Sequence, residues 1–115
     1  MATINVAGII NKDLAITATD GQLVFEKLSE KLRNSSSVVL DFSGINLIIS
    51  AFMNAAIGQL YRDYTSEFLN ASLQIIGLSE DDMSLLRSVN ERAKLFYSEK
   101  KKDLTDILDK EFKNE

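Results

Sequence analysis

The chain has 115 residues, of which 45% are hydrophobic and 26% are charged, and this size and composition favour one compact globular domain. The formal net charge of −4 argues against nucleic acid as a partner, because phosphate binding needs a basic face. The sequence contains no histidine and no cysteine, which excludes imidazole and thiolate catalysis and the metal sites that these residues build. We therefore expect no cofactor, no metal site and no enzymatic activity.

The apolar segments are all shorter than the roughly 20 residues that span a bilayer. The first ten residues lack the basic start and the long apolar centre of a signal peptide. These features predict a cytoplasmic protein without a membrane partner.

The first part of the chain is rich in residues that favour strands. Residues Thr3 to Ile10 alternate at Ile4 and Val6, and they predict a strand with a bulge or bend at the glycine. Turn-forming residues follow, and Leu14 to Thr17 predict a short second strand that returns as a hairpin.

A first helix is expected from the next segment. Thr19 and Gln22 fit a capping box, in which the threonine hydroxyl and the glutamine side chain each satisfy a free backbone amide. Apolar residues then recur at helical spacing to about Arg33, and a polar loop at 34–37 ends the helix.

The most informative stretch runs from Ser37 to Tyr64. Residues Val38 to Phe42 form a nearly continuous apolar run, which is typical of a central strand covered on both faces. A polar Asp-Phe-Ser-Gly turn and a second apolar patch lead into a helix that is predicted to begin near Ser50. One apolar stripe follows along this helix at Met53, Ile57, Leu60, Tyr64 and Phe68.

Gly58 interrupts this predicted helix. A glycine in a helix costs about 1 kcal/mol relative to alanine, so we expect a close approach to the sheet as compensation.

The last part of the chain predicts one more strand and a helix. The strand is expected at Ser72 to Leu78, and Ser79 is a candidate N-cap for a third helix with Asp82 at its third position. Residues 99–115 are charged but carry an amphipathic period, and they form either a separate C-terminal helix or a continuation of the third. Three roles stay open for this tail: docking on its own domain, pairing with a second copy, or holding a partner.

The expected order is ββαβαβα followed by a tail helix. Crossovers of this length imply parallel strands joined by right-handed connections. The predicted fold is an α/β sandwich, with a small, mostly parallel sheet of about four strands, helices packed on it and a C-terminal amphipathic helix. The predicted organisation is a domain at 1–98 and a helical tail at 99–115.

Residues at the central junction carry a resemblance to a known family. The segments Val38 to Ile45, Ser50 to Asn54 and Ile57 to Tyr61 resemble the STAS-like domains of unknown function of bacteria and archaea. These are related to the sulphate transporter and anti-sigma-factor antagonist (STAS) domains. The likeness covers about residues 4 to 98 and includes Gly21.

The resemblance implies a regulatory role in signalling through protein–protein interaction. In anti-sigma-factor antagonists, a partner kinase phosphorylates a serine in the loop that corresponds to Ile49 to Phe52. Ala51 stands at that position here, so the family's phosphorylation switch is not expected at that residue.

Each candidate site residue has a functional and a structural interpretation. Ser50 is either an anion or phosphorylation site at a helix N-terminus or an ordinary N-cap. Phe52 and Met53 either face a partner or belong to the core. Four polar residues near the strand end either form a small polar site or serve their own turns: Asp41, Ser43, Asn46 and Asn54.

We expect a non-enzymatic STAS-like regulatory domain that binds a protein partner through the loop at the start of the Ser50 helix, with Ala51 in that loop. The resemblance suggests a histidine-kinase-like ATPase of the anti-sigma-factor type as that partner. The domain itself is expected to be a monomer or a homodimer. The alternative is a sensor domain that binds a small molecule or a nucleotide through the same polar loops.

Overall fold

The computed structural model describes the backbone over residues 1–35 and 37–113 and the side chains over residues 1–35 and 37–98. A three-stranded parallel sheet forms its base, with β3 (Val38–Asp41) between β1 (Ala2–Asn5) and β5 (Leu73–Ile76). In this register Ile4, Leu40 and Ile75 are neighbours across the sheet. The predicted central position of the 38–42 strand is confirmed.

A second, two-stranded ribbon lies beside this sheet. It consists of β2 (Leu14–Ala15) and β4 (Leu47–Ile48), which pair in parallel. In place of about four strands in one sheet, the described residues therefore form a small parallel sheet and a separate short ribbon.

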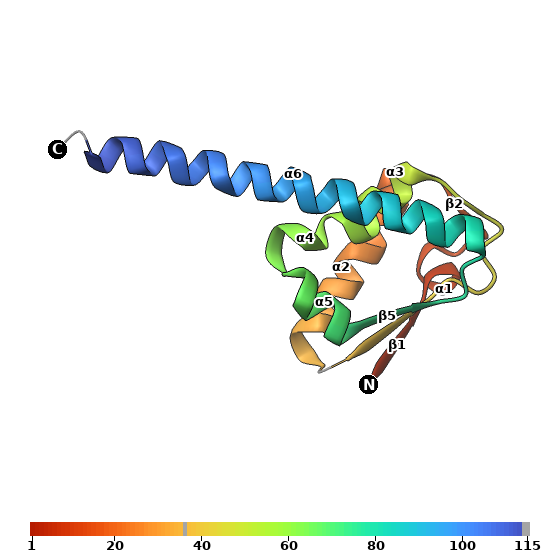
Figure 1. The fold of residues 1–115 in the computed structure, drawn as a ribbon. Coiled ribbons are helices and arrows are strands. Elements are labelled where there is room, and N and C mark those ends of the chain that lie inside the picture. The colour runs from red at the N-terminus through yellow and green to blue at the C-terminus, as the bar shows by residue number, and fades with distance from the viewer. Residues whose placement is uncertain (36, 114–115) are drawn as a thin grey trace.

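The helices lie on one side of the three-stranded sheet (Figure 1). Two long helices, α2 (Ala18–Asn34) and α6 (Glu80–Lys113), are joined by shorter segments, and α6 extends beyond the rest of the fold. The shorter helical segments are α1 (Val6–Ile10), α3 (Ser50–Met53), the π-helix η1 (Asn54–Gly58), α4 (Leu60–Asp63) and α5 (Ser66–Ser72).

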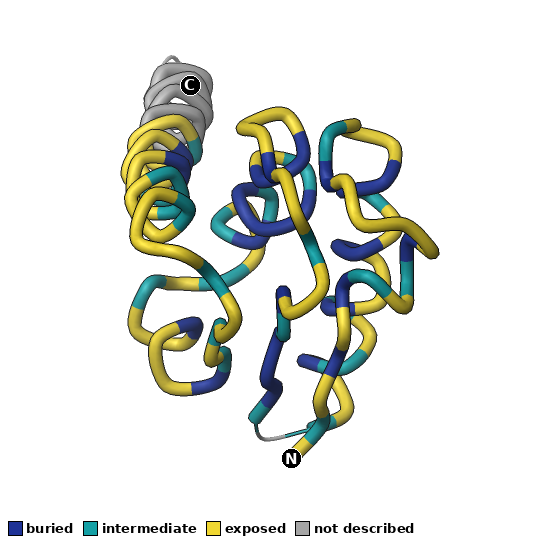
Figure 2. Tube along the Cα trace, turned by 90° about the vertical axis from the view of Figure 1, so that its right-hand side faces the viewer, coloured by how far each residue is buried: buried dark blue, intermediate teal, exposed yellow. Residues whose placement is uncertain are grey.

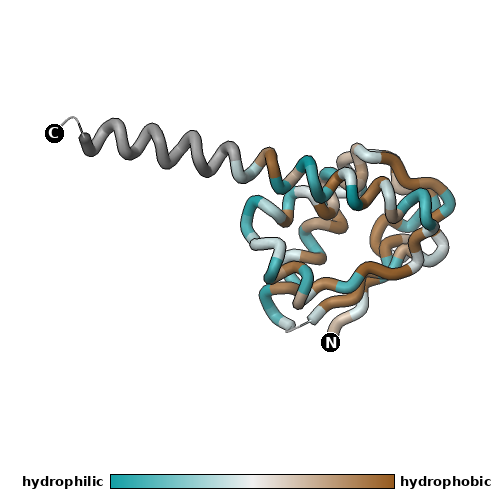
Figure 3. The backbone as a smooth tube through the Cα atoms, viewed as in Figure 1, coloured by the Kyte–Doolittle hydropathy of each residue, from teal (hydrophilic) through white to brown (hydrophobic). Residues whose placement is uncertain are grey.

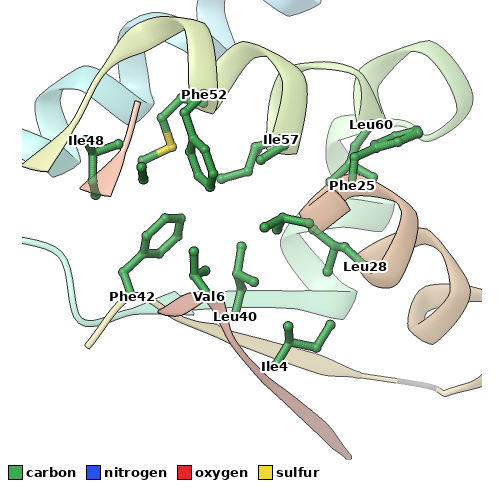
Figure 4. Close-up of a cluster of buried hydrophobic side chains, with 14 of the residues drawn as sticks. Ile4, Val6, Phe25, Leu28, Leu40, Phe42, Ile48, Phe52, Ile57 and Leu60 are labelled. Carbon is green, nitrogen blue, oxygen red and sulfur yellow. The ribbon is translucent and has the colours of Figure 1, made fainter. Parts of the chain in front are cut away.

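The hydrophobic core lies between the helices and the sheet, where the buried segments gather in Figure 2. Ile4 and Leu40 point from the strands toward the helices (Figure 4). Phe42 contacts Phe52 edge to face, with ring centroids 6.4 Å apart and an interplanar angle of 79°. This contact joins the end of β3 to the beginning of the helix that follows it.

The two faces of β3, which the sequence predicts to be covered, are covered in different ways. Val38 and Leu40 belong to the core cluster on the helical side. Val39 alternates to the opposite face, where it is buried between Thr3 and Gln74 of the neighbouring strands. In the part of the chain that the structure describes, the continuous apolar run thus reflects a central position in the sheet rather than two layers of helices.

The N-terminal strand is shorter than predicted, and the hairpin is wrong. Asn5 ends β1 and caps α1, because its Oδ1 accepts a hydrogen bond of 2.8 Å from the Gly8 amide. The predicted strand at 6–10 is therefore a helix. The predicted second strand, Leu14 to Thr17, shortens to β2, which pairs with β4 rather than with β1.

The helix after this strand begins earlier than the capping box indicated. Its N-cap is Thr17, whose Oγ1 accepts a hydrogen bond of 3.1 Å from the Asp20 amide. The Gln22 side chain instead accepts a hydrogen bond of 2.7 Å from Nε2 of Gln59, which lies between η1 and α4. The sequence contains two threonines within three residues, and the capping one is the first.

The predicted single helix from Ser50 to Phe68 first changes its winding and then breaks. After α3 the chain winds as a π-helix, η1, and then α4 ends at Tyr64, whose backbone is extended. Thr65 caps α5 by accepting a hydrogen bond of 3.1 Å from the Phe68 amide. The stripe residues before the break are buried, whereas the rings of Tyr64 and Phe68 stack on each other with centroids 4.9 Å apart.

The third helix agrees with its prediction at the N-terminus. Ser79 Oγ accepts a hydrogen bond of 3.2 Å from the Asp82 amide, as expected for an N-cap. The backbone of α6 then continues through residue 99 to Lys113 as one helix. The side chains of the predicted amphipathic tail lie outside the described residues, and the domain boundary at 98 stays a prediction.

Gly21 and Gly58 have opposite surroundings. A Cβ atom at Gly21 would lie 2.5 Å from the backbone oxygen of Phe52 and 2.8 Å from Ala55 Cβ, so glycine lets α2 and α3 approach closely. A Cβ at Gly58 would make ordinary contacts of 3.6 Å and 3.7 Å with Val89 and Ala93. Gly58 therefore faces α6, and the expected close approach to the sheet at this residue is wrong.

Candidate functional site

The polar turn after β3 is held together by its own side chains. Asp41 Oδ1 accepts a hydrogen bond of 2.9 Å from the Ser43 amide, and the Ile45 amide donates to the Phe42 carbonyl at 3.1 Å. Hydrogen bonds from the Ser43 hydroxyl and amide, and from Asn5, lower the pKa of Asp41 below its ordinary value. The carboxylate therefore stays ionised and serves the turn, as the structural interpretation proposed.

Gly77 closes this turn from the β5 side. It has a φ of +83°, and a Cβ there would lie 2.7 Å from the Ser43 nitrogen and 2.9 Å from Asp41 Oδ1. The chain after β5 thus covers one side of the turn. Little room remains at this point for a ligand.

The four polar candidates do not form one site. The Asn46 side chain donates a hydrogen bond of 2.6 Å from Nδ2 to Asp13 Oδ2. The Asn46 backbone N–H donates a second one, of 2.7 Å, to the Asp13 carbonyl. Asn54 lies on η1, at the border of a separate groove. The structure thus places Asp41 and Ser43 in the turn after β3, Asn46 against Asp13, and Asn54 at the separate groove.

The Asn46 contact fixes the ribbon of β2 and β4. Together with the hydrogen bond of 3.1 Å from the Ile49 amide to the Ala15 carbonyl, it holds the two segments at both ends of their pairing. Side chains alternate between the two faces of such a pair, so Ala15 and Ile48 are buried. The side chains of Leu14 and Leu47, the residues before them, point to the opposite face.

Three large aliphatic side chains consequently face solvent on this ribbon. The exposed fractions are 39% for Leu14, 51% for Leu47 and 39% for Ile49, and Leu14 lies opposite Leu47 in the register. We call these three residues the ribbon patch; Figure 3 shows the apolar colour along β4 as it enters α3. Sequence reasoning missed it, although Leu47, Ile48 and Ile49 are all apolar and side chains of a strand alternate between its faces, so the three could not all enter the core.

The ribbon patch continues into the first turn of α3. Ser50 and Ala51 are exposed there, as expected for an accessible rim. Ser50 is not the N-cap, which corrects the structural interpretation: the N-cap is Ile49, and α3 begins at Ser50. The Ser50 hydroxyl therefore stands at the first helical position, next to the ribbon patch.

Phe52 and Met53 do not belong to this accessible surface. Both side chains are completely buried, so the expectation that they meet a partner is wrong. The physical reason is the packing around them, since Phe52 lies against Phe42 and its backbone touches Gly21. The core interpretation holds for both.

The side chains over residues 1–35 and 37–98 contain no group of three or more histidines, cysteines, aspartates or glutamates placed to hold a metal ion. Within the described residues, no helix has the length and apolar character needed to cross a membrane. The region around the candidate residues consists instead of a structured turn, a short ribbon and an exposed aliphatic surface. Such a surface can be covered by another molecule.

A family model agrees with the resemblance read from the central junction. It describes a STAS-like domain of unknown function and matches residues 20–83, more than half of the chain. The match spans α2, the central strand, the ribbon strand β4 and the beginning of α6. Comparison with curated proteins and with solved structures yields no match. The chain belongs to the family of STAS-like domains of unknown function.

Proposed function

We propose that this domain is a non-enzymatic regulator that binds a protein partner through the ribbon patch and the adjoining Ser50 and Ala51. The observation that supports the proposal is the exposure of Leu14, Leu47 and Ile49 side by side on one ribbon. Contiguous exposed apolar residues mark interaction surfaces more often than scattered ones.

The ribbon is suited to binding because it is already ordered. The bonds between Asn46 and Asp13 hold β4 against β2, so a partner does not have to order this segment. A preorganised surface loses little conformational entropy on association, and more of the burial energy appears as affinity.

The expected contribution of one patch residue follows from its exposed area. The exposed half of a leucine side chain has roughly 80 Å² of apolar surface, and its burial is worth about 2 kcal/mol. Removing it should weaken binding by roughly tenfold or more, since every 1.4 kcal/mol is a factor of ten.

The partner class follows from the family relationship rather than from the geometry. Anti-sigma-factor antagonists, which these domains resemble, act on histidine-kinase-like ATPases. We therefore propose an ATPase of that type as the first partner to test. The regulated process would then be a signalling response.

The experiment is a calorimetric titration of the purified chain with such an ATPase encoded beside its gene, with and without nucleotide. Leu47→Ser tests the ribbon patch. Leu95→Ser is the matched control, because Leu95 is an exposed leucine on α6 with an exposed fraction of 64%. We expect saturable binding by the wild type and the control and a loss of at least tenfold with Leu47→Ser.

Two results would count against the proposal. Absence of binding at high micromolar concentrations would remove the ATPase as partner. Equal affinities of Leu47→Ser and the wild type would remove the ribbon patch as the contact surface.

A further inference from the structure

A groove separate from the ribbon patch lies between η1 and α6. It has a volume of about 410 Å³, within the range of small-molecule sites. Most of its lining is apolar or aromatic, and two polar side chains reach its border. The lining residues are Asn54, Gly58, Arg92, Ala93, Phe96 and Tyr97.

The backbone of the groove floor is unusual. Residues Asn54–Gly58 form a π-helix, a rare conformation that occurs frequently at functional sites. Asn54 and Gly58 both line the groove, and a Cβ at Gly58 would lie 3.9 Å from Asn54 Oδ1.

Neither packing nor backbone conformation requires a glycine at 58. Its φ is not positive, and a methyl group would contact Val89 and Ala93 at ordinary distances of 3.6 Å and 3.7 Å. The residue nevertheless costs about 1 kcal/mol of helix propensity relative to alanine. What the missing side chain provides is depth in the groove.

The groove also has a positive charge at its border. Arg92 donates a hydrogen bond of 3.3 Å from Nε to the Ser88 carbonyl, and it forms no ion pair with a carboxylate among the described side chains. Glu91, the acid next to Arg92 in the sequence, lies 4.0 Å from Lys94 instead. Arg92 can therefore bind an anionic group of a ligand.

The aromatic wall favours a flat ligand. The rings of Phe96 and Tyr97 have centroids 4.9 Å apart and an interplanar angle of 83°, so the groove is bordered by two aromatic planes at nearly a right angle. Aromatic side chains bind other rings by offset stacking or edge contacts. The Asn54 side-chain amide adds two N–H donors and one acceptor oxygen.

We propose that this groove binds a small organic anion with a planar aromatic body. The ring system lies over Gly58 and Ala93 against the aromatic wall, and the anionic group bonds to Arg92. This site is independent of the ribbon patch, so the two proposals can fail separately. It also differs from the sensor site expected from sequence, because Asn54 is the one polar candidate that lines the groove and the loops after β3 take no part.

The test uses 2-naphthoate as the probe and 2-naphthalenemethanol as its neutral analogue. Each is titrated into the full-length chain labelled with ¹⁵N, and amide chemical shifts are recorded. We expect saturable shifts at Asn54, Gly58 and residues 92–97 with naphthoate, and weaker binding of the alcohol by about threefold or more.

Two variants and one control locate the site. Gly58→Ala fills the floor and should abolish binding while leaving the fold as stable as the wild type or more so. Arg92→Gln should weaken naphthoate by at least about threefold and leave the alcohol unchanged. Arg87→Gln is the control, because Arg87 is exposed on the same helix and bonds to Ser84 outside the groove.

The proposal is overturned if naphthoate produces no saturable shifts at the groove, or if folded Gly58→Ala binds it as well as the wild type. Equal affinities for naphthoate and the alcohol, or equal losses in Arg92→Gln and Arg87→Gln, would overturn the assignment of an anionic ligand. Arg92 is exposed, so its substitution tests the site without disturbing the core.

Discussion

Replacing Gly21 and Gly58 by alanine should change stability in opposite directions. At Gly21 the new Cβ would lie 2.5 Å from the Phe52 carbonyl oxygen, whereas tolerated contacts begin at 3.0 Å and become ordinary at 3.4 Å. To reach 3.0 Å or 3.4 Å from the present 2.5 Å, α2 and α3 would have to separate by 0.5 Å or 0.9 Å. The obstacle is backbone, so a change of side-chain rotamer does not relieve it.

The magnitude follows from two opposing terms. Overpacking of a filled core costs about 1–3 kcal/mol, and the gain in helix propensity from glycine to alanine returns about 1 kcal/mol. Because the obstacle at Gly21 is backbone, we take the upper part of the overpacking range, about 2–3 kcal/mol, and expect Gly21→Ala to lower the free energy of unfolding by about 1–2 kcal/mol. Gly58→Ala has the same propensity gain without the clash and should raise it by about 0.5–1 kcal/mol.

The assay is urea unfolding followed by circular dichroism at 222 nm, with both variants and the wild type measured in one buffer. A shift of the midpoint at constant slope reports a change in stability rather than in the extent of unfolding. If Gly21→Ala were as stable as the wild type, the close approach of α2 and α3 would not exist as described. If Gly58→Ala were strongly destabilised, the space beside Val89 and Ala93 would be wrong.

Three further substitutions test other contacts. Lys12 lies 2.8 Å from the buried carboxylate of Asp20, and their hydrogen bond lowers the pKa of that carboxyl. The resulting stabilisation is complete above the unfolded pKa of about 3.9 and is lost as the pH falls through the lower folded value. Lys12→Met should therefore reduce stability at pH 7, with a difference from the wild type that shrinks in acid; a gap independent of pH would contradict this. Ser79→Ala should lower the free energy of unfolding by about 1 kcal/mol through loss of the bond to the Asp82 amide, while Ser79→Asp retains most of it. Gly77→Ala should lower the free energy of unfolding by about 1–3 kcal/mol, because the φ of Gly77 is +83° and the turn leaves no space for a Cβ. A urea midpoint equal to that of the wild type, for Ser79→Ala or for Gly77→Ala, would refute the corresponding prediction.

The parts of the fold that depend on neighbouring residues were predictable from the sequence. Val38 to Phe42 is apolar enough to be a central strand, and Ser79 is followed at the right distance by an amide that it caps. The family resemblance at the central junction was also readable, since the motif residues lie close together along the chain.

The two failed predictions near the N-terminus have different causes. Leu14 and Leu47 are 33 residues apart, and nothing local distinguishes their parallel pairing from the hairpin that was expected. Val6 to Ile10 has the composition of a strand, but the Asn5 side chain caps it as a helix. A tertiary pairing decided the first case, and in the second a local side-chain cap overrode the strand preference.

Only part of the stretch predicted as the candidate site is accessible. Ser50 and Ala51 are accessible, as expected, whereas Phe52 and Met53 are buried because α3 packs on α2 at Gly21. A pattern of apolar residues at a helix start does not reveal which turn faces the core. The exposed aliphatic residues lie just before the helix instead.

The most direct test of the proposed function is a map of the partner contact on the ¹⁵N-labelled chain. The histidine-kinase-like ATPase is added in steps, and the amide signals of the chain are followed. We expect the signals of residues 14–16 and 47–51 to change first and to saturate at the binding ratio. Saturable binding that leaves those signals unchanged and alters another surface would contradict the account.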